Sequence, residues 1–179
     1  VDGAIAIHKD HFAHCLVERL VEKGLIYHWS WAYNHIGFDR FHEGVAILSL
    51  NPLKPRELLV SNANDPTDYH TRKVLLAETE VDGRLVTVAS CHLSWWNKGF
   101  QEEWAQIEEE LLQCNMPLVL MGDFNNPVGY EGYQHILRSP LALQDSHAVA
   151  DTVVGTATVE GDIAGWAGNK EALKIDYIF

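Results

Sequence analysis

Hydrophobic and polar positions in the first part of the chain predict a helix, a loop and two strands. From Asp10, a suitable helix N-cap, apolar residues recur at helical spacing until Leu25. Residues 27–42 are rich in aromatic side chains and histidine but show neither a helical nor a strand period, so we expect a long loop there. Strands are expected at Gly44–Leu50 and Glu57–Ser61.

A hairpin and a second helix follow. Two strand-like runs, Arg72–Val81 and Arg84–Leu93, flank Asp82-Gly83, a dipeptide typical of two-residue hairpin turns. From Phe100 to Leu111 apolar residues recur at helical spacing, and glutamates form the opposite face. We therefore predict an amphipathic helix on the outside of a sheet.

Two further strands complete the pattern. The continuous apolar run Pro117–Met121 is typical of a central strand that is covered on both faces, and Ala172–Phe179 is the last strand candidate. This order of strand pairs and helices predicts a layered α/β or α+β domain. The length of 179 residues and a hydrophobic content of 47% suit one domain, and the chain shows no repeat or linker.

Charge and cysteine content narrow the partners and the compartment. With 13 Lys and Arg against 25 Asp and Glu, the formal net charge is −12, and the basic residues are scattered, so a nucleic-acid partner is less expected. Cys15, Cys91 and Cys114 lie in apolar stretches that suit buried free thiols and a reducing compartment. Without a signal peptide or membrane span in the sequence, we expect a cytoplasmic protein with no membrane partner.

Polar side chains at strand ends are the candidates for chemistry. Asp123 and Asn125 are separated by one residue after a buried strand, which in an extended chain places both side chains on one side. The carboxylate could bind a hard cation or take a proton from water, and the amide could donate to a phosphoryl oxygen. The alternative is an ordinary turn at Asn125-Asn126-Pro127.

Two more residues have both a structural and a functional interpretation. His92 ends the predicted hairpin and could contact a phosphate, although a histidine at a strand end is more often an ordinary surface or core residue. Asp176 lies in an otherwise apolar strand, where a buried charge needs a cation, a histidine or several donors. The alternative is an edge strand with Asp176 facing water.

Four motifs in order resemble the endonuclease/exonuclease/phosphatase superfamily: G-V-A-I-L-S at 44–49, C-H-L at 91–93, G-D-F-N-N-P at 122–127 and K-I-D-Y-I-F at 174–179. The resemblance implies a four-layer α/β sandwich, with two packed, mostly antiparallel sheets flanked by helices. It also implies hydrolysis of a phosphate ester by in-line attack of water with Mg²⁺ or Mn²⁺.

The resemblance assigns a role to each matching residue. Asp123 would position or deprotonate the water and, with Asn125, bind the metal, and Asn125 would also stabilise the phosphoryl oxygens. His92 would contact the scissile phosphate, and Asp176 would lie near the metal and the nucleophile. Arg72 resembles an arginine that touches phosphate in the deoxyribonuclease branch, and a solvated arginine at a strand start is the alternative.

Some family residues have no counterpart in this sequence. Upstream of the matching region, family members carry an Asn and a metal-binding Glu, and downstream of it they carry a Ser-Asp-His motif. Neither is found in the sequence from Val1 to Phe179. We therefore expect residues 1–179 to be a single domain of this type that is incomplete at both ends.

The strings Y-N-H-I-G-F-D-R-F-H-E-G and H-L-S-W-W-N-K-G-F-Q-E-E-W resemble a bacterial cytoplasmic subgroup that includes sugar-phosphate phosphatases such as maltose 6'-phosphate phosphatase. Trp95 and Trp96 could stack on a sugar there, or simply pack between helix and sheet. Three functions follow: a phosphatase for a small phosphorylated metabolite, a nuclease, and a non-catalytic phosphate-binding remnant. His8, His11 and His14 share a helical face, which we interpret as a solvated face and not as a metal site.

Overall fold

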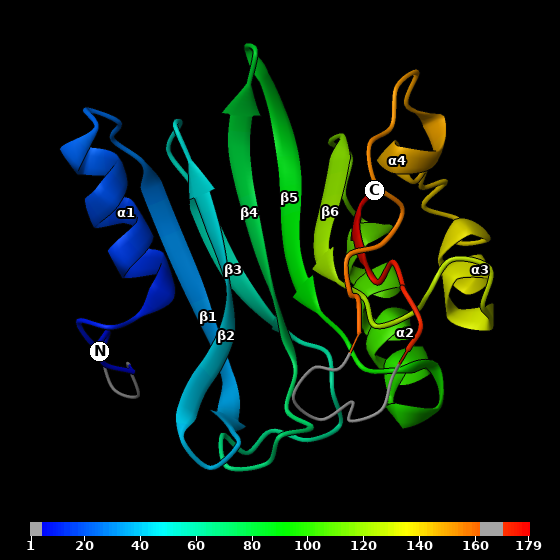
Figure 1. Cartoon of the computed structure of the whole chain (residues 1–179). Helices are drawn as coiled ribbons and strands as arrows, with labels where there is room; N and C mark the ends of the chain where they lie inside the picture. The colour runs from blue at the N-terminus through cyan, green and yellow to red at the C-terminus, as the bar shows by residue number, and fades with distance from the viewer. Residues whose placement is uncertain (1–4, 162–169) are drawn as a thin grey trace.

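Four layers of secondary structure make up the fold in the computed structural model, which describes residues 5–161 and 170–179. Helix α1 covers the two-stranded sheet β1–β2, which packs on the five-stranded sheet β3-β4-β5-β6-β7, and helices α2, α3 and α4 lie beyond it (Figure 1). The predicted four-layer α/β sandwich is confirmed. The elements are α1 (Phe12–Glu22), β1 (His28–Gly37), β2 (Phe41–Ser49), β3 (Lys54–Leu59), β4 (Lys73–Val81), β5 (Arg84–His92), the 3₁₀ helix η1 (Trp96–Lys98), α2 (Phe100–Leu111), β6 (Leu118–Asp123), α3 (Glu131–Leu137), α4 (Ser146–Val149) and β7 (Asp176–Ile178).

Neighbouring strands are antiparallel except for β5 and β6. The hairpin between β4 and β5 turns at Asp82 and Gly83, whose φ angles of 49° and 76° are those of a turn matched to the twist of the strands. Because parallel strands need a crossover, the chain passes from β5 through η1 and α2 before it enters β6. The predicted hairpin and the predicted amphipathic helix are therefore confirmed.

Two unequal clusters of buried side chains hold the layers together. Seventeen residues, including Trp104, Phe124 and Tyr177, fill the space between the five-stranded sheet and its helices. Only six, including Ala32 and Leu75, lie between the two sheets. Most of the apolar burial is therefore on the side of the five-stranded sheet that carries α2 and α3.

The loop expected at residues 27–42 is wrong, because most of this segment forms β1 and its hairpin to β2. In β1 aromatic residues alternate with small or polar ones: Trp29, Trp31 and Tyr33 lie on one face and Ala32 on the other. Both faces of the strand are covered. The indole rings of Trp29 and Trp31 contact His11 of the α1 end, and Ala32 packs between the sheets. The alternation of aromatic with small or polar residues ends at Asn34, so it covers only part of the segment 27–42.

A β-bulge interrupts β1 at Asn34. Tyr33 pairs with Gly44 and His35 with Glu43, so one extra residue lies between two consecutive pairs. A bulge reverses which face the following residues occupy. His35 therefore points inward beside Glu43, and its side chain is only 2% exposed.

Two predictions about where helices and strands begin or end are also wrong. The N-cap of α1 is His11 and not Asp10, because the His11 side chain accepts a hydrogen bond from the His14 amide. The last strand covers only Asp176–Ile178 of the expected range. No helix in the described ranges has the length and apolar character needed to cross a membrane.

Candidate active site

His92, Asp123 and Asp176 lie in one row across three neighbouring strands. His92 on β5 is the register partner of Asp123 on β6, and Asp123 is the partner of Asp176 on β7. Register partners project to the same face of a sheet. Their chain neighbours Cys91, Phe124 and Tyr177 project to the opposite face, into the large core. The three side chains that the sequence singled out separately are thus brought together at one edge of the sheet.

Asp123 is held with its carboxyl half-buried. Its Oδ1 accepts a hydrogen bond of 2.8 Å from the Asn125 amide, and its Oδ2 lies 3.8 Å from Nε2 of His92. Burial and then the charge of Asp176 raise the pKa of Asp123 to about 6, against the lowering effects of the Asn125 amide and Arg72. A carboxylate with a pKa near neutrality is suited to accept a proton from water.

The pKa of His92 is shifted in the opposite direction. Burial, followed by electrostatic interaction with Arg72 and His35, lowers its pKa to about 4. The imidazole is therefore neutral at pH 7. In that state it can donate one hydrogen bond and accept another, which suits contact with a phosphate ester without ionisation of the ring.

Asn125 does not continue the extended strand, so strand spacing does not determine where its side chain lies relative to Asp123. The chain turns at Asn125, which has a left-handed φ of 50°, and its side-chain nitrogen donates a 2.7 Å hydrogen bond to the Leu93 carbonyl. One amide N–H is thus used inside the fold, where it ties β5 to the turn after β6. The other remains able to donate to a phosphoryl oxygen.

Arg72 lies immediately before β4 with two buried nitrogens, Nε and Nη1, that have no hydrogen-bond partner among the described residues. Burial lowers its pKa, and Glu103, Glu43 and Asp123 act in the opposite direction. Because the guanidinium stays charged, its unpaired N–H groups are costly unless an anion meets them. This arrangement favours the phosphate-contacting interpretation of Arg72.

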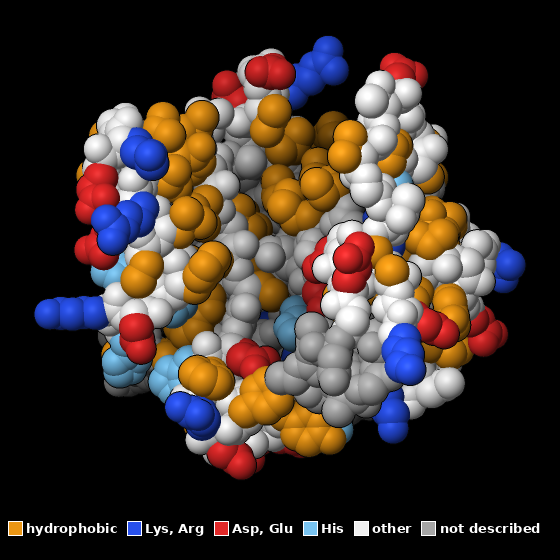
Figure 2. Space-filling model, in the orientation of Figure 1, with side chains coloured by type: hydrophobic (Ala, Val, Ile, Leu, Met, Phe, Trp, Pro, Cys, Tyr) orange, Lys and Arg blue, Asp and Glu red, His pale blue; other side chains and the backbone are white. Residues whose placement is uncertain are grey.

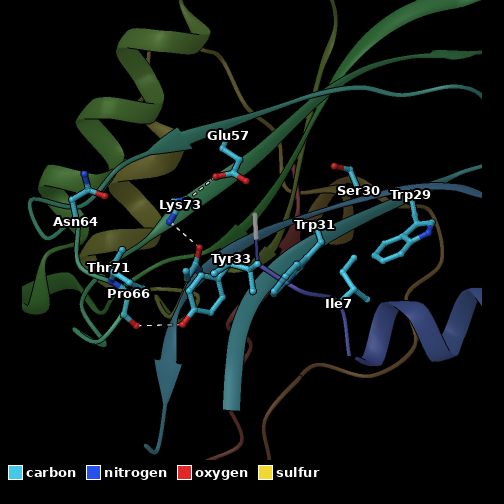
Figure 3. Close-up of a pocket in the computed structure, with 12 residues that line it drawn as sticks. Ile7, Trp29, Ser30, Trp31, Tyr33, Glu57, Asn64, Pro66, Thr71 and Lys73 are labelled. Atoms are coloured by element: carbon cyan, nitrogen blue, oxygen red, sulfur yellow. Dashed lines mark hydrogen bonds and ion pairs between the residues drawn. The ribbon is translucent and has the colours of Figure 1, made fainter. Parts of the chain in front are cut away.

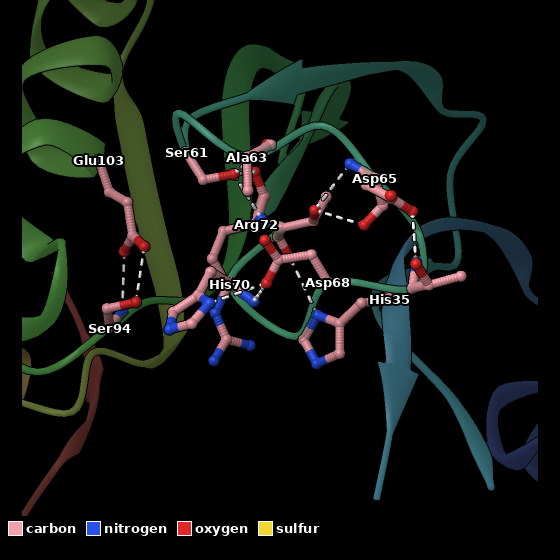
Figure 4. A network of polar contacts seen from close by, with 11 residues as sticks. His35, Ser61, Ala63, Asp65, Asp68, His70, Arg72, Ser94 and Glu103 are labelled. Carbon is pink, nitrogen blue, oxygen red and sulfur yellow. Dashed lines mark hydrogen bonds and ion pairs between the residues drawn. The ribbon is translucent and has the colours of Figure 1, made fainter. Parts of the chain in front are cut away.

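Glu103 was assigned by its sequence pattern to a charged outer face, but it is 2% exposed. Its two oxygens accept hydrogen bonds of 2.7 and 2.6 Å from the amide and hydroxyl of Ser94 (Figure 4). Burial raises the pKa of Glu103, while Ser94 and then Arg72 lower it. The carboxylate thus joins α2 to the segment that follows His92, and only its place one residue before Trp104 hinted at burial.

Asp123 and Asp176 also supply oxygen atoms at the place where a metal ion would bind. No group of three or more His, Cys, Asp or Glu side chains in the described ranges is arranged to hold a metal. Mg²⁺, however, commonly takes one or two carboxylates and completes its coordination with waters and substrate phosphate. A cation would relieve the repulsion from Asp176 that adds to burial in raising the pKa of Asp123. The oxygen donors present therefore fit Mg²⁺ or Mn²⁺.

Two cavities adjoin β1. One, of about 730 Å³, is lined by His92 and by residues of the α1 end and the β1–β2 hairpin, including Glu43 and Trp31. The other, of about 550 Å³, is lined by Trp29, Trp31 and Tyr33 and contains none of the predicted site residues (Figure 3). The first cavity reaches the row at His92, while Asp123, Asp176 and Arg72 are not among its lining residues, and this contact with His92 makes it the candidate substrate cavity.

Trp96 packs against the large core, with its ring 5.9 Å from that of Phe100 and 5.3 Å from that of His135. Trp95 is half-buried and precedes η1. Neither tryptophan is among the lining residues of the cavity that His92 lines. Their contact with substrate stays a prediction, and for Trp96 the packing role is present.

Comparisons with known proteins give consistent results. The sequence profile described as "Endonuclease/Exonuclease/phosphatase family" matches residues 8–179. A structure of a protein of that family from Leptotrichia buccalis C-1013-b is 26% identical, with a TM-score of 0.81, 98% of this chain covered and 68% of that one. The human nocturnin catalytic domain, solved with a bound sulfate anion, is 19% identical with a TM-score of 0.63, and 96% of this chain and 64% of that one are covered. D. rerio TDP2, solved with a single-strand DNA product, is 13% identical with a TM-score of 0.63, and the match covers 92% of this chain and 65% of that one.

The chain thus spans about two thirds of the length of these structures. No curated protein matches it. The last two likenesses, below 25% identity, concern the fold alone, whereas the profile match covers almost the whole chain. The row of His92, Asp123 and Asp176 lies within the matched residues, and the chain belongs to the endonuclease/exonuclease/phosphatase family, whose members are hydrolases of phosphate esters.

Proposed function

We propose that this domain hydrolyses the phosphomonoester of a small metabolite, such as a sugar phosphate. The observation that carries the proposal is the row of His92, Asp123 and Asp176, together with the unpartnered N–H groups of Arg72. The row supplies a base and a neutral hydrogen-bonding ring, and Arg72 supplies the charge that a phosphate needs.

Each residue has a defined task in this reaction. Asp123, with its raised pKa, positions the attacking water and takes its proton. Arg72 and the free amide N–H of Asn125 donate to the phosphoryl oxygens, and neutral His92 holds the ester in line. Mg²⁺ or Mn²⁺, held by Asp123 with Asn125 and close to Asp176, would neutralise phosphate charge.

The overall charge favours a small substrate. A net charge of −12 gives no electrostatic gain on meeting a polyanion. On the face shown in Figure 2, Lys and Arg side chains are scattered and form no continuous stripe. A single phosphate group, in contrast, can be satisfied locally by Arg72 and a bound cation.

Nuclease activity is the second candidate, because the family profile includes nucleases and the TDP2 structure of the same fold holds a DNA product. The test is a screen of the protein, expressed from its complete reading frame, against sugar phosphates, inositol phosphates and duplex DNA with Mg²⁺. We expect phosphosugars to be hydrolysed much faster than DNA is nicked at physiological salt. Efficient DNA cleavage without phosphosugar turnover would replace the proposal with the nuclease, and no hydrolysis at all would leave the non-catalytic role.

Asp123→Asn tests the site itself. The substitution keeps the shape of the side chain but removes its basicity, so turnover should fall by roughly 10²–10⁴ with the far-UV circular dichroism unchanged. Asp82→Asn, in the exposed hairpin turn, is the matched control and should keep full activity. Unchanged turnover in Asp123→Asn would rule out the assigned role.

A further inference from the structure

The cavity of about 550 Å³ beside β1 takes no part in the proposed reaction. Its lining residues come from β1, from β3, from the start of β4 and from the loop between β3 and β4. The candidate catalytic residues His92, Asp123, Asp176 and Arg72 are not among them. What this cavity can bind is therefore determined by side chains outside the catalytic row.

Aromatic rings of β1 form one wall of the cavity. Trp29, Trp31 and Tyr33 follow the strand in Figure 3, and the two tryptophans are half-buried. The rings of Trp31 and Tyr33 have centroids 5.7 Å apart and planes inclined by 56°. Rings at this angle do not form a flat slot for a planar base, whereas a puckered sugar can lay its C–H face on one of them while its hydroxyls project sideways.

The charged residues among the described lining residues are Lys73 on β4 and Glu57 on β3, and they neutralise each other. Nζ of Lys73 lies 2.7 Å from Oε2 of Glu57, and both side chains remain partly exposed. The pair offers no net charge to an anion. It does place a donor beside an acceptor, since the ammonium has two further N–H groups and the carboxylate has further lone pairs, and this arrangement suits two neighbouring hydroxyls.

Asn34 supplies a second, independent indication of a ligand. Its Oδ1 accepts a hydrogen bond of 3.0 Å from the Lys73 amide, which can only donate, so the orientation of the side-chain amide is fixed. Nδ2 is then a buried donor without a hydrogen-bond partner among the described residues, in a side chain that is 2% exposed. An unsatisfied buried donor is costly, and an acceptor on a ligand would remove that cost. The bulge at this residue fits such a role, because bulges re-aim side chains beside functional sites.

We propose that this cavity is a binding site for an uncharged sugar ring. The C–H face of the ring lies against Trp29 and Trp31, and its hydroxyls bond to Lys73, Glu57 and Nδ2 of Asn34. The inference goes beyond the proposed hydrolysis and does not depend on it. Trp31 also lines the candidate substrate cavity, so the two cavities share one side chain.

The test is isothermal titration calorimetry of the protein from its complete reading frame with glucose, trehalose and, as a flat heteroaromatic probe, adenosine. We expect the sugars to bind. Trp29→Leu, which keeps an apolar group but removes the stacking face, and Lys73→Met, which keeps the stem but removes the donors, should each weaken binding by about tenfold or more. Tyr130→Leu removes an aromatic ring that is 57% exposed and lines none of the cavities described above, so this control should bind as the wild type does.

The sugar ring could be a free sugar or the far end of a phosphorylated substrate, and a second titration distinguishes them. Trehalose 6-phosphate and glucose 6-phosphate are titrated into Asp123→Asn, in which turnover is prevented. If trehalose 6-phosphate binds about tenfold more tightly than both trehalose and glucose 6-phosphate, one ligand spans the two cavities. If it binds no more tightly than the better of the two, the site takes a free sugar. This second titration alone rests on the proposed function.

Three results would overturn the inference. The first is that neither glucose nor trehalose binds, and the second is that adenosine binds and the sugars do not. The third is that the sugars bind Trp29→Leu and Lys73→Met as tightly as the wild type. Thermal melting shows that each variant is folded when its binding is measured, and the exposed Lys73 keeps the test valid if Trp29→Leu unfolds. The proposed function is judged separately, by hydrolysis, and stands or falls without these titrations.

Discussion

Asp123 and His92, which are register partners, have pKa values displaced in opposite directions. That of Asp123 rises from 3.8 to about 6, chiefly by burial, and that of His92 falls from 6.5 to about 4, also chiefly by burial. The same desolvation thus favours the neutral form of both groups. Near pH 5 the site holds an uncharged acid beside an uncharged base.

These displacements predict opposite contributions to stability between pH 4 and 6.5. Asp123 binds its proton more tightly in the folded state, so its contribution is present below pH 3.8 and is lost as pH rises through about 6. His92 binds its proton less tightly when folded, so its contribution is present above pH 6.5 and is lost as pH falls towards about 4. In the wild type the two slopes oppose each other.

Single variants should separate the two slopes. Relative to wild type, and with a chelator present, the free energy of unfolding of Asp123→Asn should rise with pH over this range, and that of His92→Gln should fall. His92 is not among the groups that shift the pKa of Asp123, and Asp123 is not among those that shift the pKa of His92. Each pKa shift should therefore survive substitution of the other residue. Urea denaturation at several pH values measures both slopes, and parallel slopes in the two variants would contradict the prediction.

Which residues meet at the site was partly readable from the sequence. His92, Asp123 and Asp176 stood at strand ends in a recognisable order, and the strands bring them together. His35 and Glu43 could not be selected, because their approach depends on a bulge that no residue type signals. Glu103 was hidden among other glutamates, and only the packing of α2 shows that it is buried.

At the scale of elements, the parallel pairing of β5 and β6 depends on Gly122. This residue pairs with Cys91, has a φ of 129°, and any Cβ there would collide with the Cys91 carbonyl oxygen. Asp123 follows directly and takes its place in the catalytic row from this close approach. The backbone contact thus connects strand pairing to the chemistry of the site.

Gly122→Ala should therefore disturb both the sheet and the site. Because the collision is with backbone, which cannot move aside cheaply, we expect a loss of more than about 2 kcal/mol in the free energy of unfolding. Gly129→Ala is the matched control, since Gly129 has a φ of 86° with nothing near its Cβ position, and should cost only about 1 kcal/mol of backbone strain. Equal losses in urea denaturation would show that φ alone matters.

A buried ion pair anchors the start of β7. Nζ of Lys174 lies 2.7 and 2.9 Å from the two oxygens of Asp145, and both side chains are almost fully buried. Lys174→Met leaves the Asp145 carboxylate without its cation and should cost about 3–5 kcal/mol. The double variant Lys174→Met with Asp145→Leu should recover much of that loss. A double-mutant cycle by thermal or urea unfolding checks this, and additive losses would mean that the pair is not coupled.

Elements that carry their own local signal were the predictable ones. The β4–β5 hairpin and α2 carry a turn dipeptide or a one-sided apolar stripe that belongs to the segment itself. Strand β1 was taken for a loop because the alternation of its aromatic residues with smaller ones ends at the bulge at Asn34 and does not extend over the segment. The length of β7 is determined by its pairing with β6, and the sequence of residues 172–179 carries no signal for that pairing.

At the scale of the molecule, the net charge predicts how turnover depends on salt. The net charge of −12 gives no electrostatic gain on meeting a polyanion, so we expect turnover of a small phosphate ester to vary little between 50 and 200 mM salt, conditions over which binding to DNA weakens strongly. Steady-state kinetics over this range measures it. A steep loss with salt would indicate a localised basic surface and favour the nuclease candidate.

The unequal size of the two cores also determines which part of the fold opens first. Six buried residues attach β1 and β2 to the rest, whereas seventeen hold β4, β5, β6 and β7 against α2 and α3. Backbone amides of β1 and β2 should therefore exchange with deuterium earlier than those of β5 and β6, by an opening that costs less than global unfolding. Each such opening would withdraw His35 and Glu43 while His92 and Asp123 stay in place. The candidate substrate cavity, which Trp31 and Glu43 line together with His92, would then exist in two interconverting populations, one with its β1–β2 wall in place and one without it, in proportions that depend on temperature and on ligand.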